Sequence, residues 1–309
     1  MRALVTGAAG FLGSHVCDRL LREGYDVVGL DNLVTGRRAN VAHLEGERRF
    51  SLRIHDVVQP LSLDGELDWI FHLACPASPP KYLAFPIETM RTCSEGTLHM
   101  LDLAQAKKAG ILLASTSEVY GDPLEHPQHE AMWGNVNPVG PRSVYDEGKR
   151  FAEALATSYH RERGLSIRLP RIFNTYGPRL DPDDGRVVTN FIKQAMAGVP
   201  LTVYGDGSQT RSIQYVDDLV EGFMRLTAVD HAGPVNLGNP EEYTMLELAK
   251  LVRELTHSRS EIVFAPLPVD DPRRRRPDIT LAKKLLDWAP RITAREGLGR
   301  TIASTPPPT

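Results

Sequence analysis

A tyrosine and a lysine four residues apart, Tyr145 and Lys149, are well suited to acid–base chemistry. On a helix, residues spaced i and i+4 share one face, so the phenol and the ammonium would be neighbours. The phenol has an ordinary pKa of about 10, and a nearby positive charge favours its ionised form. Tyr145 could then take the proton from a substrate hydroxyl held by Thr116 while a hydride leaves that carbon. Alone, such a pair is also common on exposed helix surfaces.

A glycine-rich turn near the N-terminus predicts a dinucleotide that would accept the hydride. Gly7, Gly10 and Gly13 follow a short apolar segment and open a helical one, with Phe11 and Leu12 between the last two glycines. Glycines permit a tight turn and close approach of the backbone to a pyrophosphate, which the helix N-terminus binds. The spacing is G-x-x-G-x-x-G, and taken alone it indicates no more than a tight strand-to-helix turn.

An acidic residue at the end of the second predicted strand favours NAD as that dinucleotide. Asp31 could accept hydrogen bonds from ribose hydroxyls and would repel the 2′-phosphate of NADP. We assign Asn32, Val57 and Leu73 to the same cofactor site. Asp56 follows the third predicted strand, where it could bind the adenine amino group or serve as an ordinary turn residue.

The order of these features along the chain argues against coincidence. The glycine turn comes first, then Asp31, then Thr116 at the end of a strand, and finally Tyr145 and Lys149. The carboxyl ends of strands in a doubly wound sheet face the ligand crevice, so Thr116 is predicted to lie there. Lys149 would also bind the nicotinamide ribose.

Short apolar segments alternate with amphipathic ones, which predicts a parallel sheet covered by helices on both faces. Gly24 follows the first predicted helix, where a left-handed C-cap is expected. Pro170 cannot donate a hydrogen bond within a sheet, so we expect an edge position or an irregularity there. Strands are predicted over residues 2–6, 26–30, 50–55, 68–74, 111–116 and 166–172, and helices over residues 12–23, 87–108 and 144–163.

After about residue 174 the predicted strands become shorter and Pro and Gly more frequent, which indicates a smaller substrate domain. We therefore predict an α/β protein with a Rossmann-type doubly wound parallel sheet in residues 1–173. A smaller α/β substrate-binding domain would occupy residues 174–309, with some segments returning to the first domain. Its helices are predicted near residues 186–197, 216–228, 244–256 and 279–287.

Composition excludes several other classes of protein. The 309 residues are 41% hydrophobic with a net charge of −3, so no basic nucleic-acid surface is indicated. The three cysteines have no metal-ligand spacing and predict neither a disulfide framework nor a metal site. We see no signal peptide and no apolar segment near the roughly 20 residues of a membrane span. We expect a cytoplasmic protein with small-molecule partners.

Longer stretches of the chain resemble extended short-chain dehydrogenase/reductases that act on nucleotide sugars, and among these the UDP-glucuronate decarboxylases. The resemblance implies oxidation of UDP-glucuronate at C4, which makes the C6 carboxylate part of a β-keto acid. Such an acid loses carbon dioxide readily, and return of the hydride to C4 would give UDP-xylose with no net redox change. The resemblance covers roughly residues 2–300 and is carried by residues 72–80, 113–123, 133–138, 140–142, 145–150, 171–179, 184–188 and 201–211.

The resemblance also implies roles for three residues beyond the tyrosine and lysine. Glu118 would orient the sugar or manage a proton or water at C5, and Arg275 would lie near the carboxylate or the C5 protonation step. A guanidinium suits a planar carboxylate, although the arginines at 273–276 could instead form a solvated basic surface. Ser117 stands where similar 4,6-dehydratases have an aspartate that helps to expel water, which argues against dehydration.

The substrate's uridine and pyrophosphate are expected in the second domain. The matching positions are Asn174, Tyr204 and Arg211, and we add Arg186 to this set. Ser117 and Arg179 are also predicted to bind the substrate. The predicted helices over residues 87–108 and 144–163 match those that form a four-helix dimer interface in similar enzymes, so a homodimer is expected.

The chain departs from the family pattern at a few positions. Cys93 replaces the usual asparagine, Arg91 a lysine, and Phe85 lies in an altered Tyr-Asn-Pro segment. These departures bear on cofactor-side hydrogen bonding and on the product. The residues leave open a decarboxylase that releases the 4-keto pentose, a 4-epimerase, or a non-catalytic NAD-binding sensor. A sensor would have no need for the hydroxyl, tyrosine and lysine together.

Overall fold

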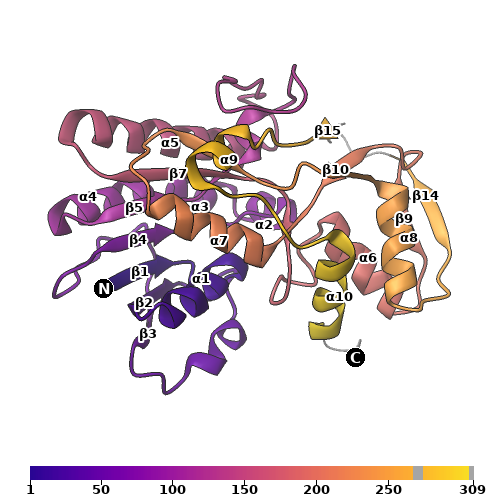
Figure 1. Cartoon of the computed structure of the whole chain (residues 1–309), viewed down its shortest axis with the longest axis horizontal. Helices are drawn as coiled ribbons and strands as arrows, with labels where there is room; N and C mark the ends of the chain where they lie inside the picture. The colour runs from indigo at the N-terminus through magenta and orange to yellow at the C-terminus, as the bar shows by residue number, and fades with distance from the viewer. Residues whose placement is uncertain (267–273, 306–309) are drawn as a thin grey trace.

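The protein is described by a computed structural model that covers residues 1–266 and 274–305, so Arg273 and the proline-rich end of the chain lie outside the described residues. Its main element is an eight-stranded sheet in the order β12-β7-β5-β4-β1-β2-β3, with β6 also paired to β7 (Figure 1). The pairs are parallel, which confirms the predicted doubly wound sheet. Its strands are β1 (Arg2–Thr6), β2 (Asp26–Asp31), β3 (Phe50–Ile54), β4 (Trp69–His72), β5 (Gly110–Leu113), β6 (Ser115–Thr116), β7 (Ile167–Ile172) and β12 (Pro234–Leu237).

Helices cover both faces of this sheet because successive strand side chains point to opposite faces. In β1, Ala3 and Val5 pack in one apolar cluster with α1 (Phe11–Arg22) and α7 (Val216–Thr227). Leu4 packs in a second cluster with α4 (Thr97–Lys107) and α5 (Ser143–Arg163). The sheet is therefore buried on both sides, and ligands can reach it only at its ends.

The predicted helix over residues 87–108 is not uniform. It consists of α3 (Pro86–Arg91), a π-helical turn over Thr92–Gly96 and α4. The other predicted helices and strands lie within a few residues of their observed bounds. Gly24 follows α1 with φ of +86°, which confirms the left-handed position there. The short helix α2 (Pro79–Ala84) was not predicted.

Pro170 produces an irregularity rather than an edge. Its strand, β7, lies inside the sheet, between β12 on one side and β5 and β6 on the other. The ladder with β5 stops at Leu112 opposite Arg168, and pairing resumes at Ser115 in β6. The interruption falls opposite Pro170, as expected of a residue without an N–H donor.

The later part of the chain forms smaller sheets and helices, grouped in Figure 1 around α6, α8 and β9. One later strand, β12, and the helix α7 return to the large sheet. None of the helices in the described part of the chain combines the length and apolarity that a membrane crossing demands. The remaining strands and α-helices of the described residues are β8 (Thr175–Tyr176), α6 (Val187–Met196), β9 (Leu201–Tyr204), β10 (Thr210–Ser212), β11 (Gln214–Tyr215), β13 (Glu242–Thr244), α8 (Met245–Leu255), β14 (Ile262–Ala265), β15 (Arg274–Arg275), α9 (Thr280–Leu286) and α10 (Ala294–Ser304).

Candidate active site

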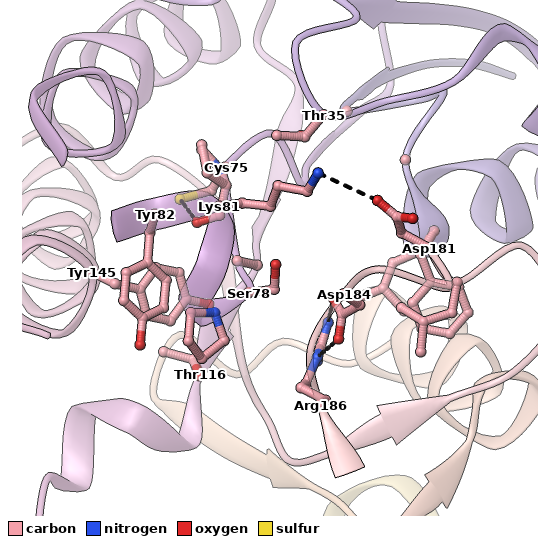
Figure 2. A pocket seen from close by; sticks show the side chains of 18 of the residues that line it. Thr35, Cys75, Ser78, Lys81, Tyr82, Thr116, Tyr145, Asp181, Asp184 and Arg186 are labelled. Carbon is pink, nitrogen blue, oxygen red and sulfur yellow. Dashed lines mark hydrogen bonds and ion pairs between the residues drawn. The ribbon is translucent and has the colours of Figure 1, made fainter. Parts of the chain in front are cut away.

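A cavity of about 800 Å³ is lined by loops after the strands of the large sheet and by segments from the later part of the chain (Figure 2). The sequence-predicted site residues all contribute to its wall. They are Gly7, Gly10, Phe11, Leu12, Gly13, Asp31, Asn32, Asp56, Val57, Leu73, Thr116, Ser117, Glu118, Tyr145, Lys149, Asn174, Arg179, Arg186, Tyr204, Arg211 and Arg275. The fold therefore gathers into one cavity residues that are far apart in the sequence.

The glycine turn between β1 and α1 is too tight for other residues. Gly7 has φ of +70°, a conformation that favours glycine. A Cβ atom at Gly13 would lie 2.0 Å from the Gly7 carbonyl oxygen, so the helix can approach the strand only without a side chain there. The first residues of α1 line the cavity, and the N–H groups of a first helical turn have no partner within the helix, as a pyrophosphate site requires.

Asp31, at the end of β2, is fixed by main-chain donors. Its two carboxylate oxygens accept hydrogen bonds from the N–H groups of Ala9 (2.9 Å) and Leu33 (2.8 Å). Burial raises the pKa of Asp31, and these two hydrogen bonds oppose the rise. Beside it, the Asn32 amide donates to the Asp56 carboxylate at 3.0 Å. The residues predicted to bind the adenosine half of a dinucleotide thus meet at one edge of the cavity.

The hydroxyl, tyrosine and lysine also meet at the cavity. Tyr145 lies in the first turn of α5, is buried, and hydrogen-bonds Thr116 at the end of β6. Lys149, one turn later, places its Nζ 5.9 Å from the centre of the Tyr145 ring. The same Nζ donates to the Ala114 carbonyl at 2.9 Å, beside the interruption in the sheet. Lys149 is therefore held in place by backbone that the Pro170 irregularity leaves available.

The pKa of Tyr145 does not follow the simple expectation of a lowered value. Burial is the largest influence and raises this pKa well above its usual value, and the charge of the nearby Cys75 raises it further. The hydrogen bond with Thr116 acts in the opposite direction. Protein groups alone therefore keep the phenol protonated, and its ionisation requires an additional positive charge close to the ring.

A second tyrosine, Tyr82, packs against the ring of Tyr145. Tyr82 of α2 stacks on Tyr145, with ring centres 5.2 Å apart and planes 7° from parallel (Figure 2). Burial raises the pKa of Tyr82 to about 12, and its hydroxyl has no hydrogen-bond partner among the described residues. Tyr82 was not predicted from the sequence, because the helix that carries it is short and begins with two prolines.

Another part of the cavity wall contains a carboxylate, Glu118, that lies between two arginines. Glu118 follows β6 and pairs with Arg275 of β15 and with Arg142, whose Nη2 lies 2.7 Å from the carboxylate. Burial alone would raise the pKa of Glu118, but the charges and hydrogen bonds of the two arginines lower it to about 2. Arg275 is buried, and its Nη2 has no hydrogen-bond partner among the described residues. The Arg275 side chain lines the cavity, and an unpaired guanidinium nitrogen of this kind is suited to an anionic partner.

Two further residues near Glu118 and Arg275, Arg142 and Asp146, were not predicted from the sequence to have a role in the site. Arg142 precedes Tyr145 by three residues, a spacing that could have indicated a shared helix face. Asp146 is buried, and burial and the charge of Glu118 raise its pKa to about 7, with Arg142 opposing the rise. One ionised carboxylate and one close to half-protonated at neutral pH therefore lie near the two arginines.

The substrate side of the cavity carries further paired charges. Arg186, at the start of α6, binds Asp184 through two nitrogens, one of them at 2.9 Å. Lys81 of α2 reaches to within 3.5 Å of Asp181 from the opposite wall (Figure 2). The cavity is also lined by Asn174, which follows β7, by Tyr204 of β9 and by Arg211 of β10.

Arg179 differs from the other predicted substrate-binding residues. It lies on the cavity wall, but its guanidinium donates to the Asn40 carbonyl (3.1 Å) and binds Asp18 (2.7 Å) and His15 (2.8 Å). These contacts tie the segment after β8 to the first part of the chain. These contacts indicate a structural role for Arg179, which joins the two parts of the chain at the cavity wall.

Comparison with known proteins places this fold and site in a family. Residues 3–238 match the sequence profile described as the NAD dependent epimerase/dehydratase family. The chain belongs to this family. The resemblance to extended short-chain dehydrogenase/reductases is thereby confirmed.

Relatives with similar sequences within the family are decarboxylases by name. The chain is 57% identical to UDP-glucuronic acid decarboxylase 1 of Arabidopsis thaliana over 303 residues, 98% of this chain and 69% of that protein. It is 56% identical to the protein of the same name from Danio rerio over 301 residues, 97% of this chain and 72% of that protein.

Solved structures of the family share the whole fold. UDP-glucuronic acid 4-epimerase from Bacillus cereus, in complex with UDP-glucuronic acid and NAD, superposes with a TM-score of 0.86 at 28% identity. UDP-glucose 4-epimerase from Thermotoga maritima, with UDP-glucose, gives a TM-score of 0.88 at 29% identity. Each match covers 98% of both chains.

Proposed function

We propose that this protein is an NAD-dependent decarboxylase that converts UDP-glucuronate into UDP-xylose. The observation that carries the proposal is the buried guanidinium of Arg275, which lines the same cavity as the Thr116–Tyr145 pair and whose Nη2 has no hydrogen-bond partner among the described residues. A guanidinium recognises a planar carboxylate through parallel hydrogen bonds. A sugar acid bound there would bring its carboxylate and an oxidisable hydroxyl to the two halves of the site.

The residues of the cofactor side fit NAD. The glycine turn leaves room for a pyrophosphate against α1, and Asp31 holds a fixed carboxylate where the adenosine ribose would lie. A 2′-phosphate would meet the charge of Asp31 at this position, which favours NAD over NADP. When bound, NAD supplies both the hydride acceptor and the positive nicotinamide charge that the phenol of Tyr145 requires.

Three residues would manage the proton of the C4 hydroxyl. Thr116 holds the hydroxyl, and Tyr145 takes its proton during oxidation and returns one during reduction. Lys149 keeps its ammonium beside the phenol and is available to the ribose. The 4-ketone is β to the C6 carboxylate, so it accepts the electron pair that is released with carbon dioxide.

The arginine cluster would manage the carboxylate and the proton at C5. Arg275 binds the carboxylate before it leaves. Glu118 is ionised at neutral pH, since its pKa is about 2, and is therefore an acceptor that orients a sugar hydroxyl or a water rather than a proton donor. Ser117 is no carboxylic acid and cannot expel water as a dehydratase aspartate would.

The uridine and pyrophosphate are assigned to Asn174, Arg186, Tyr204 and Arg211 on the substrate side. With them we propose the division of the chain into a cofactor domain, residues 1–173, and a substrate domain, residues 174–309, from which β12 and α7 return to the large sheet.

The functional unit in this proposal is a homodimer. Ile87 and Met90 on α3 and Phe151 on α5 are exposed in the single chain, and α3 packs against α5. An exposed apolar face of this kind is suited to a second copy. Sedimentation at micromolar concentration should give a dimer, and Phe151→Glu should give a monomer; a wild-type protein that sediments only as a monomer would refute this part.

Product analysis tests the catalytic proposal. The purified protein is incubated with UDP-glucuronate, with UDP-glucose as the control substrate, and carbon dioxide and the nucleotide sugar are measured. We expect carbon dioxide and UDP-xylose from UDP-glucuronate alone. UDP-galacturonate without carbon dioxide would instead establish a 4-epimerase, and a 4-keto pentose nucleotide with accumulated NADH would establish an enzyme that releases the ketone. NAD binding without turnover of UDP-glucuronate would favour a sensor.

A further inference from the structure

Two cysteines lie against each other at the cavity wall. Cys75 follows β4, lines the cavity and is partly exposed, whereas Cys93 lies in the π-helical turn between α3 and α4 and is buried. Their sulfur atoms are 3.5 Å apart and are hydrogen-bonded, and both thiols are free. Figure 2 shows Cys75 on the wall of the cavity.

The pair is packed onto the helix that carries the acid–base residues. Gly148 lies between Tyr145 and Lys149 on α5, and a Cβ atom there would come within 3.2 Å of the Cys93 sulfur. The Cys93 side chain therefore rests directly on the backbone of α5 at its catalytic turn. A displacement of either cysteine is transmitted to this turn, because the packing leaves no gap.

The two thiols differ in reactivity. The hydrogen bond from Cys93 lowers the pKa of Cys75, and Lys149 lowers it further against the effect of burial, to about 7. The same hydrogen bond and burial raise the pKa of Cys93. Cys75 is thus the thiolate that can react with a small oxidant entering through the cavity, and Cys93 is the neighbour placed to resolve the product.

We propose that Cys75 and Cys93 form a reversible disulfide that switches the enzyme off under a peroxide oxidant. The Cys75 thiolate attacks hydrogen peroxide, so that an S–O bond forms, the O–O bond breaks and hydroxide leaves. The Cys93 sulfur then attacks the Cys75 sulfur, the S–O bond breaks, and hydroxide leaves with the Cys93 proton as water. Both thiols are oxidised, two electrons reduce the peroxide, and a dithiol reductant reverses the reaction.

The disulfide is expected to reduce turnover because the residues next to Cys75 contact the glycine turn. Disulfide formation brings the sulfur atoms closer by about 1.5 Å. The backbone N–H groups of Leu73 and Ala74, just before Cys75, donate to the Thr6 hydroxyl at 3.1 Å, and Ala74 packs against Gly7 of the glycine turn. The movement therefore strains the cofactor turn and the catalytic turn of α5 together. This consequence for turnover rests on the proposed function, whereas the formation of the bond does not.

The test combines peptide mapping with activity. Full-length protein is treated with hydrogen peroxide, free thiols are alkylated, and the digest is analysed by mass spectrometry. We expect a Cys75–Cys93 cross-linked peptide that lacks two hydrogens, alkylated Cys17 as the internal control, and turnover reduced about 100-fold, as small misplacements at a catalytic site can cause. Dithiothreitol should remove the cross-link and restore turnover.

A Cys93→Ser variant is the matched control. Its turnover after peroxide is compared with its own turnover before oxidation, and it should give no cross-linked peptide. Alkylation of both Cys75 and Cys93 after peroxide would overturn the proposal, as would a cross-linked protein with unchanged turnover. If the reduced protein has no activity on UDP-glucuronate, the proposed function fails, and the cross-link with its reversal by dithiothreitol still decides whether the redox pair exists.

Discussion

The two sides of the cavity are built in different ways. The cofactor side consists largely of backbone: a glycine turn that excludes side chains, and a carboxylate, Asp31, held by two N–H groups. The reacting end of the substrate side consists of charged side chains that balance one another, with Glu118 between Arg142 and Arg275. Backbone geometry is insensitive to small changes in charge, whereas a buried charge cluster depends on every member. Changes on the two sides should therefore have separable effects.

The largest effect is expected at Tyr145, where the two sides meet. Tyr145→Phe removes the proton acceptor but keeps the stacked ring, so turnover of UDP-glucuronate should fall by about 10³-fold or more while NAD binding stays within a few-fold. Carbon dioxide release and NAD titration measure the two quantities. Tyr159→Phe, on the same helix but outside the cavity, is the control and should keep its turnover. Full turnover by Tyr145→Phe would refute the assigned base.

The next effect is expected at Arg275. Arg275→Gln removes the carboxylate donor, and decarboxylation should slow by about 10²- to 10³-fold, since a buried charged hydrogen bond contributes about 2–5 kcal/mol. NAD affinity should be unchanged. The control is Arg276→Gln, because Arg276 pairs with Glu242 outside the cavity. Equal losses in the two variants would contradict a specific role for Arg275, and a large loss of NAD affinity in Arg275→Gln would contradict the separation of the two sides.

The charge cluster should also be visible in the pH dependence of stability, through Asp146. The pKa of Asp146 in the folded protein is raised to about 7, so the folded state holds the proton more tightly than the unfolded state. The resulting contribution to the free energy of unfolding is therefore complete at low pH and is lost as the pH rises through about 7. Between pH 5 and pH 7 this amounts to about 2–3 kcal/mol of unfolding free energy. Asp146→Asn should remove that part of the pH dependence in denaturant unfolding, whereas Glu147→Gln, its neighbour on α5, should retain it. An unchanged profile in Asp146→Asn would contradict the raised pKa.

The smallest effect is expected on the cofactor side. The wild-type protein should bind NAD more tightly than NADP, and Asp31→Asn should reduce the preference by about tenfold, because the charge that repels a 2′-phosphate is gone. Asp26→Asn, at the exposed start of β2, is the control. Titration with both cofactors gives the ratio. A preference that is unchanged in Asp31→Asn would show that another residue sets it.

The difference between the two sides also explains what sequence analysis could predict. The glycine turn and Asp31 lie close together in the sequence, and their spacing alone indicates a strand, a turn and a helix. The contacts of Glu118 with Arg142 and Arg275 span 24 and 157 positions, and the second depends on the pairing of β15 with β10. Arg275 was assigned only through resemblance, and Arg142 was given no role.

Local irregularities of the backbone were also difficult to predict from the sequence. The π-helical turn that carries Cys93 packs against α5, and no spacing in the sequence indicates this turn. Pro170 shows the opposite case. Its missing N–H predicted an irregularity at the right place, but only the structure shows that the strand lies inside the sheet and that Lys149 binds the neighbouring Ala114 carbonyl.

The central claim is that C4 is oxidised and then reduced within one turnover while C5 loses its carboxylate. UDP-glucuronate carrying deuterium at C4 tests it directly, with the product analysed by NMR. We predict UDP-xylose that retains the deuterium at C4 and, when the reaction is run in heavy water with unlabelled substrate, gains one deuterium at C5. Loss of the C4 deuterium to solvent or to free cofactor, or a product that keeps its carboxylate, would contradict the account.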